Sequence, residues 1–390
     1  MSFDLSHRRT AAAAPLPDAL SERLKFNGDN RFHRELRRRV DAQFKHSGTR
    51  QRDSAAMYLK TAVILAMFAA SYIALVFFAT NGWLALAIST VLGSTVACIG
   101  FNVMHDGGHQ AYSDRRWINR LMALTLDLVG GSSYIWQWKH ARFHHTWVNV
   151  AGHDSDIDLG VLGRLSPEQP WRPWHRWQHL YLWVLYGVTA IRWHVYGDFR
   201  DMITGRVGER PFDRPHGWDL VGFVIGKLVF FTLAFGLPLM LHSIGAVLLF
   251  YTTTSAVAGV LLALVFQMAH VVEEADFPAP NAQSRQMDTP WAIHQLETTV
   301  DFSRDSRVLS WLIGGLNFQI EHHLFPRISH VHYPAVARVV EATCREYGIT
   351  YRTHRSFAAG IASHYRWLRQ LAMPVDVVPP ALLPIDAVPH

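Results

Sequence analysis

The sequence predicts an all-α membrane protein in which four transmembrane helices form two hairpins beneath a cytosolic helical cap. Three observations lead to this fold class. Hydrophobic residues make up 49% of the chain, and many of them concentrate in four long apolar runs. Nearly all Lys and Arg residues lie outside those runs. Clusters of histidine lie at or beyond the ends of the runs, where a cap would sit.

Each apolar run is long enough to cross about 30 Å of hydrocarbon as a helix that rises about 1.5 Å per residue. The second and fourth runs contain no Asp, Glu, Lys or Arg. Lys60 and Asp219 lie near helix ends, where their charges are expected to reach the membrane interface. Lys227 is deeper and needs either snorkelling or a partner. The predicted spans are residues 57–80, 83–104, 218–241 and 245–269.

The distribution of basic residues predicts the orientation. The connections within the two pairs, near residues 81–82 and 242–243, contain no Lys or Arg. Because positive charge accumulates on cytosolic loops, both termini and the long middle segment are expected in the cytosol. The predicted organisation is a basic cytosolic N-terminal segment, a main domain and a cytosolic C-terminal tail, at residues 1–54, 55–350 and 351–390.

The two ends of the chain carry weaker expectations. The N-terminus is not expected to be a secretory signal, because its apolar stretch is short and Pro15 and Pro17 follow it. Residues 1–30 are expected to form a flexible lead, and residues 31–53 a basic helix whose solvated face touches anionic lipid. The proline-rich residues 373–390 are expected to be disordered.

Two weaker apolar stretches occur in the middle segment, at residues 118–134 and 180–195. Charges interrupt them, or Trp and Tyr are frequent in them. We therefore expect interfacial helices that lie on the bilayer and do not cross it. Four tryptophans fit such an interfacial belt: Trp171, Trp174, Trp177 and Trp183.

Composition argues against several other functional classes. Cys98 lies in an apolar run and Cys344 in the polar C-terminal part, so no disulfide and no cysteine-based metal site is expected. A basic cytosolic face around membrane helices explains the net charge of +6. No nucleic-acid-binding module is recognisable, so nucleic acid is not an expected partner.

The histidine clusters carry the chemistry. Eight of the 23 histidines form them: His105, His109, His140, His144, His145, His270, His322 and His323. Residues four apart lie on one face of a helix. His105 and His109 therefore point at one metal region if the second span continues past the bilayer. His140 and His144 are expected to do the same, with His145 in a neighbouring position.

The predicted topology places all eight imidazoles at the cytosolic face. They are too many for one ion, so a dimetal site in the cap is the natural interpretation. Neutral imidazole binds iron, copper and zinc. The His-Glu-x-x-His motif of zinc proteases is absent. The two cysteines cannot supply a blue-copper or iron–sulfur centre. Spacing alone leaves iron, zinc and copper open.

These clusters resemble the three histidine boxes of the membrane fatty acid desaturase family. They are HDGGH at 105–109, HARFHH at 140–145 and QIEHH at 319–323. The stretch GGLNFQIEHHLFP at 314–326 is the most specific part. It is similar to the acyl-lipid and front-end branch, in which Gln replaces the first histidine of the third box. The resemblance covers roughly residues 55–350.

The resemblance implies four membrane helices, a cytosolic cap and a diiron site. By position, the eight histidines correspond to the metal ligands, with His270 as the extra one from the fourth span. Gln319 stands where other branches have a ligand. Three roles are open for it: weak metal binding, a hydrogen bond to a metal-bound water, or shaping of the site. Asp106 and Glu321 are candidates to orient imidazoles through their ring N–H groups.

Other polar residues near the boxes are weaker candidates. Five follow the second box and would hold the cap or a headgroup, or form an ordinary polar loop: Asn149, His153, Asp154, Asp156 and Asp158. Three more would line the substrate entrance and are not expected to be ligands: Trp291, His294 and Gln295.

The implied activity is that of an O2-dependent fatty acyl desaturase, which introduces a cis double bond into a long acyl chain carried as acyl-CoA or acyl-lipid. A methylene C–H bond has no useful acidity, so the reaction needs a redox metal. The cofactors would be two Fe ions, with O2 as co-substrate. No fused cytochrome b5 motif or nucleotide-binding glycine fingerprint is visible. A separate ferredoxin or cytochrome b5-like donor is therefore expected, steered by the basic face.

Two alternatives remain open from the sequence. A hydroxylase or ketolase with similar boxes would add oxygen to a lipid or alkane and leave no new double bond. A non-catalytic membrane metal carrier or sensor would bind metal without consuming O2. The sequence does not distinguish a front-end double bond from another position. It predicts an apolar acyl tunnel below the metals, lined by the cytosolic ends of the spans.

Overall fold

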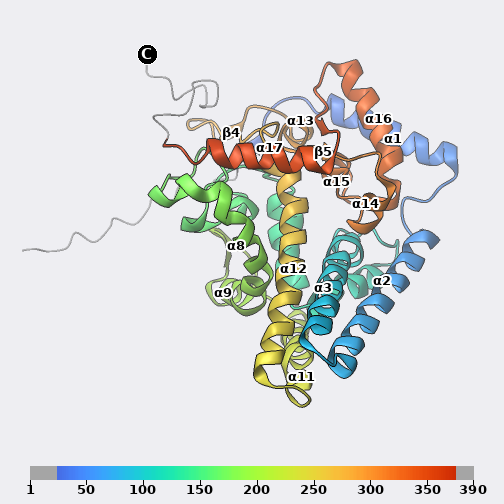
Figure 1. Ribbon diagram of the computed structural model, residues 1–390. Helices are drawn as coiled ribbons and strands as arrows, with labels where there is room; N and C mark the ends of the chain where they lie inside the picture. The colour runs from blue at the N-terminus through green and yellow to red at the C-terminus, as the bar shows by residue number, and fades with distance from the viewer. Residues whose placement is uncertain (1–23, 375–390) are drawn as a thin grey trace, which may run out of the picture.

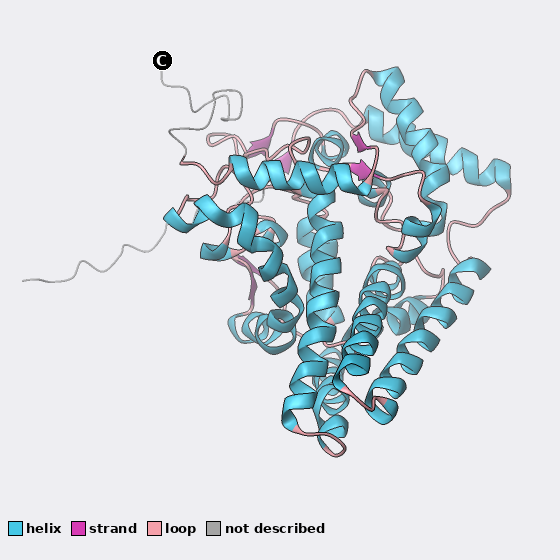
Figure 2. Cartoon of the chain, in the orientation of Figure 1, coloured by secondary structure: helices cyan, strands magenta, loops and turns pink. Residues whose placement is uncertain are grey.

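The computed structural model describes residues 24–374, so the expectations for residues 1–23 and 375–390 lie outside this range. The described chain is largely helical, with three short two-stranded ladders that pair β1 with β4, β2 with β3, and β5 with β6 (Figure 2). The strands are β1 Lys25–Phe26, β2 Arg206–Val207, β3 Arg210–Pro211, β4 Gln286–Met287, β5 Asp301–Phe302 and β6 Thr353–His354.

Four helical segments are long and apolar enough to cross a membrane, as predicted: Ala55–Phe78, Gly82–Gly108, Trp218–Leu239 and Ile244–His270. The first three include a π-helical turn. Figure 1 shows α3 between α2 and α12. The helices of these segments are α2 Ala55–Ile73, α3 Gly82–Cys98, α4 His105–Gly108, α10 Trp218–Phe231, α11 Leu237–Leu239 and α12 Ile244–His270.

Polar caps begin two of the spans directly after the short connections. The Asn81 side chain accepts a hydrogen bond from Leu84 N at 2.9 Å, and Ser243 Oγ accepts one from Ala246 N at 3.4 Å. Such caps satisfy amide groups that a helix start leaves without partners. Farther along, α3 and α12 approach closely, because a Cβ on Gly93 would lie 2.5 Å from the carbonyl oxygen of Thr254.

Two buried lysines show how the spans accommodate charge. Lys227 has the partner that the sequence required, since its ammonium lies 2.6 Å from Asp198 Oδ2 and 2.7 Å from Gly130 O. The expectation that Lys60 reaches the interface is wrong. Lys60 is only 5% exposed, and its Nζ lies 2.9 Å from His330 Nε2. The segment after the third box covers this end of α2 and replaces solvent with an imidazole.

The remaining helices surround the histidine ends of the spans. Figure 1 shows α17 lying across the end of α12, with α1 and α16 beside it. Their bounds are α1 Arg31–Ser47, α5 Arg116–Ala123, α6 Thr125–Leu128, α7 Ser133–Trp136, α8 Gln178–Arg192, α9 Asp198–Thr204, α13 Trp291–Thr298, α14 Arg307–Leu312, α15 Gln319–Leu324, α16 Tyr333–Tyr347 and α17 Phe357–Gln370.

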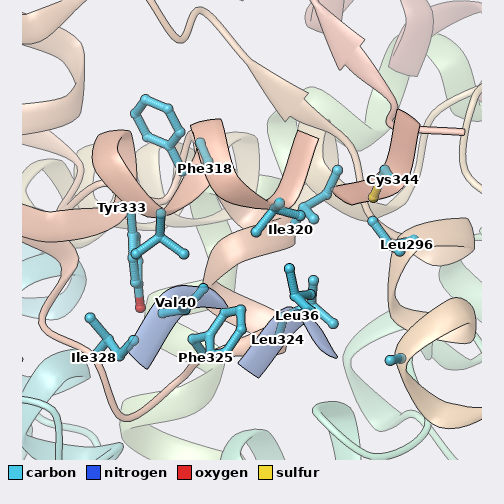
Figure 3. Packing of buried hydrophobic residues seen from close by; sticks show 14 of the residues in the cluster. Leu36, Val40, Leu296, Phe318, Ile320, Leu324, Phe325, Ile328, Tyr333 and Cys344 are labelled. Atoms are coloured by element: carbon cyan, nitrogen blue, oxygen red, sulfur yellow. The ribbon is translucent and has the colours of Figure 1, made fainter. Parts of the chain in front are cut away.

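The basic segment before the first span forms the amphipathic helix α1. Its buried face includes Leu36 and Val40, which pack with Leu324 of α15, with Phe325 directly after it, and with residues of α16 (Figure 3). Burial of this apolar stripe stabilises α1 against the helix that carries the third box. Contact of its polar face with lipid stays a prediction.

The ends of the described chain are more ordered than expected. Residues 24–30 are not a flexible lead, because β1 pairs with β4 and the Phe26 ring stacks on Trp147 at a centroid distance of 4.7 Å. After residue 350 the chain continues as β6 and α17. Helix α17 buries Trp367 and Leu368, and the carbonyl of Val271, directly after α12, accepts a hydrogen bond from His364.

The middle segment is more divided than predicted. Residues 118–134 are covered by the short helices α5 and α6 and the start of α7, not by one helix. Residues 180–195 lie mainly in α8, which packs along α12, where a Cβ on Gly259 would lie 2.6 Å from Tyr186 O. Trp174 and Trp177 are exposed. Their interfacial location stays a prediction.

Candidate metal centre

The structure brings all eight predicted histidines together. His105 lies in α4, and His109 directly follows it. His140 and His144 come from a π-helical segment, Gln137–His144, and His145 follows. His270 ends α12, while His322 and His323 lie in α15. All eight side chains are buried. Elements far apart in the sequence therefore contribute imidazoles to one buried region.

The ring nitrogens separate into two groups. Within each group, one nitrogen per residue lies within 4.8 Å of the corresponding atoms of the others. The first histidine group is His105, His109, His140 and His322, and the second histidine group is His144, His270 and His323. His145 forms a further set with His322 and His323 and so lies between the two groups. Two adjacent clusters of imidazoles suit two metal ions better than one.

The second box departs from the predicted helical geometry. His140 and His144 lie in a π-helical segment and not in the expected α-helix, but their rings still stack at a centroid distance of 5.0 Å, and with Asp156 they form a further set of potential ligands. His140 also belongs to the first group and His144 to the second. A π-helix bonds residue i to i+5 and widens the turn. His145 Nε2 consequently lies 3.3 Å from His140 Nε2. One short segment thereby serves both groups.

Several ring nitrogens in this region have no hydrogen-bond partner. They are buried and include Nε2 of His109, His144 and His322, and Nδ1 of His145. A buried polar atom without a partner is costly, so such atoms call for an explanation. Lone pairs that converge from several imidazoles are the donor set of a transition metal. The residues present therefore fit a pair of metal ions.

The opposite ring nitrogens are held by other side chains and carbonyls. His144 Nδ1 lies 2.9 Å from Asp154 Oδ2, and His323 Nδ1 lies 2.9 Å from Gln295 Oε1. His322 Nδ1 lies 3.1 Å from the Tyr333 hydroxyl. His270 Nδ1 faces the carbonyl of Thr298 at 3.3 Å. Such partners fix the tautomer and the direction of a metal-binding imidazole.

Sequence reasoning named Asp154, Asp156 and Gln295 for other roles and did not name Tyr333. Asp154 does more than hold a polar loop, since it also accepts a hydrogen bond from Asn149 N at 3.0 Å. Asp156 Oδ2 lies 3.5 Å from His140 Nδ1. Two aspartates a few residues after a His-rich segment were the available signal for Asp154 and Asp156. No local pattern marks Gln295 or Tyr333, because only tertiary folding brings them to the third box.

The other weak candidates make different contacts. Asn149 Nδ2 donates to the carbonyl of His270 at 2.8 Å and so ties the second box to the end of α12. Trp291 Nε1 donates to the carbonyl of His145 at 3.2 Å. His294 is buried against the ring of Phe26. Two more candidates contact nearby backbone: His153 faces Ala151 O, and Asp158 accepts from Gly160 N.

Asp106 and Glu321 are both buried, but their hydrogen bonds among the described residues go to groups other than the box imidazoles. Asp106 Oδ2 accepts from Ser329 Oγ at 2.9 Å. Glu321 Oε1 accepts from the Tyr351 hydroxyl at 3.0 Å. Burial, together with the charge of Asp301, raises the pKa of Glu321 well above its usual range.

Gln319 lies at the edge of the second histidine group. Its terminal amide nitrogen is 2.9 Å from His270 Nε2 and 3.4 Å from His323 Nε2, while its oxygen has no partner. The two orientations of an amide are assigned from its hydrogen bonds. Rotation of the amide by half a turn would direct its oxygen at the same two imidazoles. From that position the oxygen could bind a metal or accept a hydrogen bond from a metal-bound water.

Burial sets the protonation of the imidazoles. Together with neighbouring histidines, it lowers the pKa values of His145, His322 and His323 well below the usual range. Burial acts in the same direction on His144, but the Asp154 carboxylate outweighs it and raises the pKa of His144. Most of these rings are therefore neutral at pH 7 and can offer a lone pair to a metal.

An apolar cavity of about 80 Å³ lies among α2, α3, α10 and α12. Its wall includes Val129, Ala258, Leu75 and Phe250. Phe250 is near the end of α12 that is opposite to His270, so the cavity extends deeper along the spans than the predicted tunnel lining. Its apolar wall suits hydrocarbon.

Comparison with known proteins agrees with these features. A family profile described as "Fatty acid desaturase" matches residues 81–355. The chain is 37% identical over 352 residues to the sn-1 linoleoyl-lipid 6-desaturase of Synechocystis sp.. The aligned residues are 90% of this chain and 98% of that protein. It is 35% identical over 349 residues to the protein of the same name from Arthrospira platensis, covering 88% of this chain and 93% of the relative.

A third relative is similar over most of this chain. The acyl-lipid (8-3)-desaturase of Physcomitrium patens is 34% identical over 346 residues, which are 88% of this chain and 72% of that protein. The family profile spans all three histidine boxes within one continuous stretch. The chain therefore belongs to the fatty acid desaturase family and is a membrane oxidoreductase that introduces double bonds into fatty acyl chains.

Proposed function

We propose that this desaturase is a diiron enzyme of the front-end type that acts on acyl-lipids at the cytosolic face of the membrane. The observation that carries the proposal is the convergence of eight buried imidazoles in two adjacent groups, several with a ring nitrogen that has no protein partner. This donor set matches the needs of a metal pair and has no other evident use.

One iron would be held by the first histidine group and the other by the second, with His145 close to both. Gln319 would complete the second group, directly or through a water. When bound, the irons supply the redox chemistry with O2 that an unactivated methylene C–H bond requires. Asp154, Gln295 and Tyr333 orient the imidazoles from behind, and the surrounding apolar cap keeps bulk water away from the reacting carbon.

The substrate proposal rests on the relatives and on the third box. Two relatives are named as linoleoyl-lipid 6-desaturases and a third as an acyl-lipid (8-3)-desaturase. The third box of this chain resembles the same branch through Gln319. We infer that the new cis double bond forms between an existing double bond and the carboxyl end of a lipid-bound chain, whose hydrocarbon extends toward the apolar cavity.

The electrons would come from a separate ferredoxin or cytochrome b5-like protein. The orientation with both termini and the metal centre in the cytosol follows from the basic residues of the long segments. An acidic donor would be attracted to this face, since opposite charges accelerate association at low ionic strength.

The test is expression in a host that lacks desaturases, with a ferredoxin supplied and the lipids analysed by mass spectrometry. Linoleoyl-lipids should acquire a double bond on the carboxyl side of the existing ones. His144→Ala and His322→Ala should abolish the product, whereas His179→Ala, outside both groups, should retain it. Unchanged lipids, or a product that carries added oxygen and no double bond, would contradict the proposal.

A further inference from the structure

A buried chain of polar side chains adjoins the first box and is separate from the partners that hold the metal-facing imidazoles. Lys60, Asp106 and His330 are only 5%, 1% and 3% exposed. Lys60 Nζ lies 2.9 Å from His330 Nε2, and His330 Nδ1 lies 3.0 Å from Asp106 Oδ1. An ammonium only donates, so Nε2 is the acceptor and the proton of the neutral ring resides on Nδ1, which lies close to the carboxylate without the geometry of a hydrogen bond.

These three side chains join segments that are distant in the sequence. Lys60 belongs to α2, Asp106 to α4, and His330 to the short turn His330–His332 that follows α15. A second set of contacts closes the same junction. Asp106 Oδ2 accepts from Ser329 Oγ at 2.9 Å and from His330 N at 3.3 Å. The first span and the segment after the third box thus hold the first box from two sides.

The buried charges of Lys60 and Asp106 depend on one another. Asp106 and Lys60 are buried ions of opposite sign, bridged by a neutral imidazole. The Lys60 ammonium also lies over the Trp311 ring, at 5.1 Å from its centroid. Removal of one ion from such a pair leaves an uncompensated buried charge, whereas removal of both does not. The fold at this point is therefore sensitive to either residue alone.

A disturbance at Asp106 would act on the first histidine group, because Asp106 lies between two of its members. Helix α4 has four residues, and both His105 at its start and His109 directly after it belong to the first histidine group. The second group takes no residue from α4. The turn before α4 is π-helical, so regular α-helical bonding does not by itself fix the direction of the two imidazoles.

We propose that Lys60 and His330, acting through Asp106, are positioning residues that hold His105 and His109 in the geometry of the first histidine group. This inference rests on the proposed diiron function. Its consequence is selective. Loss of the contacts among Lys60, His330 and Asp106 should weaken the metal position of the first histidine group and spare the other, whereas a general loss of stability would affect both.

The experiment measures iron per folded chain and Mössbauer spectra of purified, iron-loaded protein. Lys60→Met should reduce iron from two per chain toward one, with an iron affinity of the weakened position about 10–100-fold lower. The spectrum should lose one of two components. Lys60→Arg should retain both irons, and Lys60→Met combined with Asp106→Asn should recover the second iron because no buried charge is left alone.

Lys227→Met is the matched control, because Lys227 is likewise a buried lysine in a span with a carboxylate partner, but its hydrogen bonds go to Asp198 and Gly130, outside the first box. It should keep two irons per folded chain. If Lys60→Met does not fold, His330→Asn provides the same test, since Asn retains a donor toward Asp106 but is too short to reach Lys60.

Two irons with unchanged spectra in folded Lys60→Met or His330→Asn protein would overturn the inference. Equal iron loss in Lys227→Met would also overturn it, because the loss would then reflect general destabilisation. A wild-type chain that never holds two irons would instead overturn the proposed diiron function, and the positioning role with it.

Discussion

At the scale of single residues, the imidazoles depend on the groups behind them. The clustering of the eight histidines was predictable from sequence because residues four apart lie on one helix face, and because the boxes lie at the same ends of the spans, whereas their role as ligands stays a prediction. Their partners were less predictable. Asp154 and Gln295 were assigned to a loop and an entrance, yet each faces the Nδ1 atom of a box histidine. Such assignments require the relative positions of segments that sequence spacing does not supply.

Asp154→Asn should weaken iron binding at the second histidine group. The substitution keeps the size of the side chain but removes the charge that raises the pKa of His144. The expected loss is about 10–100-fold in iron affinity, without loss of the helical fold. Titration with Fe(II) under anaerobic conditions measures it. Asp158→Asn, in the same loop, is the control and should bind iron as the wild type does. Equal affinities for both variants would remove Asp154 from the metal centre.

At the scale of elements, the spans were the most predictable part, since apolar length is a strong signal and all four predicted segments are present. Local backbone geometry was less predictable. The second box is π-helical, and both His144 and His145 lie close to His140. Hydrophobic periodicity does not detect one π-turn. Helix α1 packs its apolar stripe on α15 and α16, and the expected contact of its basic face with lipid stays a prediction.

The close packing of α3 on α12 makes Gly93 a sensitive position. Gly93→Ala places a Cβ 2.5 Å from the Thr254 carbonyl oxygen, so the helices must separate. The expected cost is on the order of 1–3 kcal/mol in the free energy of unfolding. Thermal unfolding in detergent monitors the change. Gly245→Ala is the matched control, because a Cβ at that position would have no neighbouring atom within 4 Å. A Gly93→Ala protein as stable as Gly245→Ala would show that the two helices do not need this contact distance.

At the scale of the whole molecule, α1, α15, α16 and α17 enclose the histidine ends of the spans (Figure 1). Sequence reasoning placed the boundary of the main domain near residue 350. Helix α17, which lies after that boundary, packs onto α12 through Trp367 and His364. The amphipathic pattern of a short helix does not reveal which surface it covers. The sequence thus predicted the spans and the clustering of the histidines, while the enclosure of the cluster required the structure.

The proposed orientation predicts opposite accessibility for the two ends of the spans. In a chain whose Cys98 and Cys344 are replaced by alanine, Ser47→Cys reports on the α1 side and Met240→Cys on the connection before α12. Both native positions are exposed. A membrane-impermeant maleimide should label Met240→Cys in intact cells and Ser47→Cys only after permeabilisation. The reverse pattern would place the metal centre on the outer side.

The most direct test of the account is the metal content and ligation of the purified wild-type chain. Elemental analysis with X-ray absorption at the iron edge should find two irons per folded chain in a nitrogen-rich environment, and His144→Ala or His322→Ala should lower that number. A folded, active enzyme that holds zinc, a single iron or no metal would contradict it, as would full iron content in either variant.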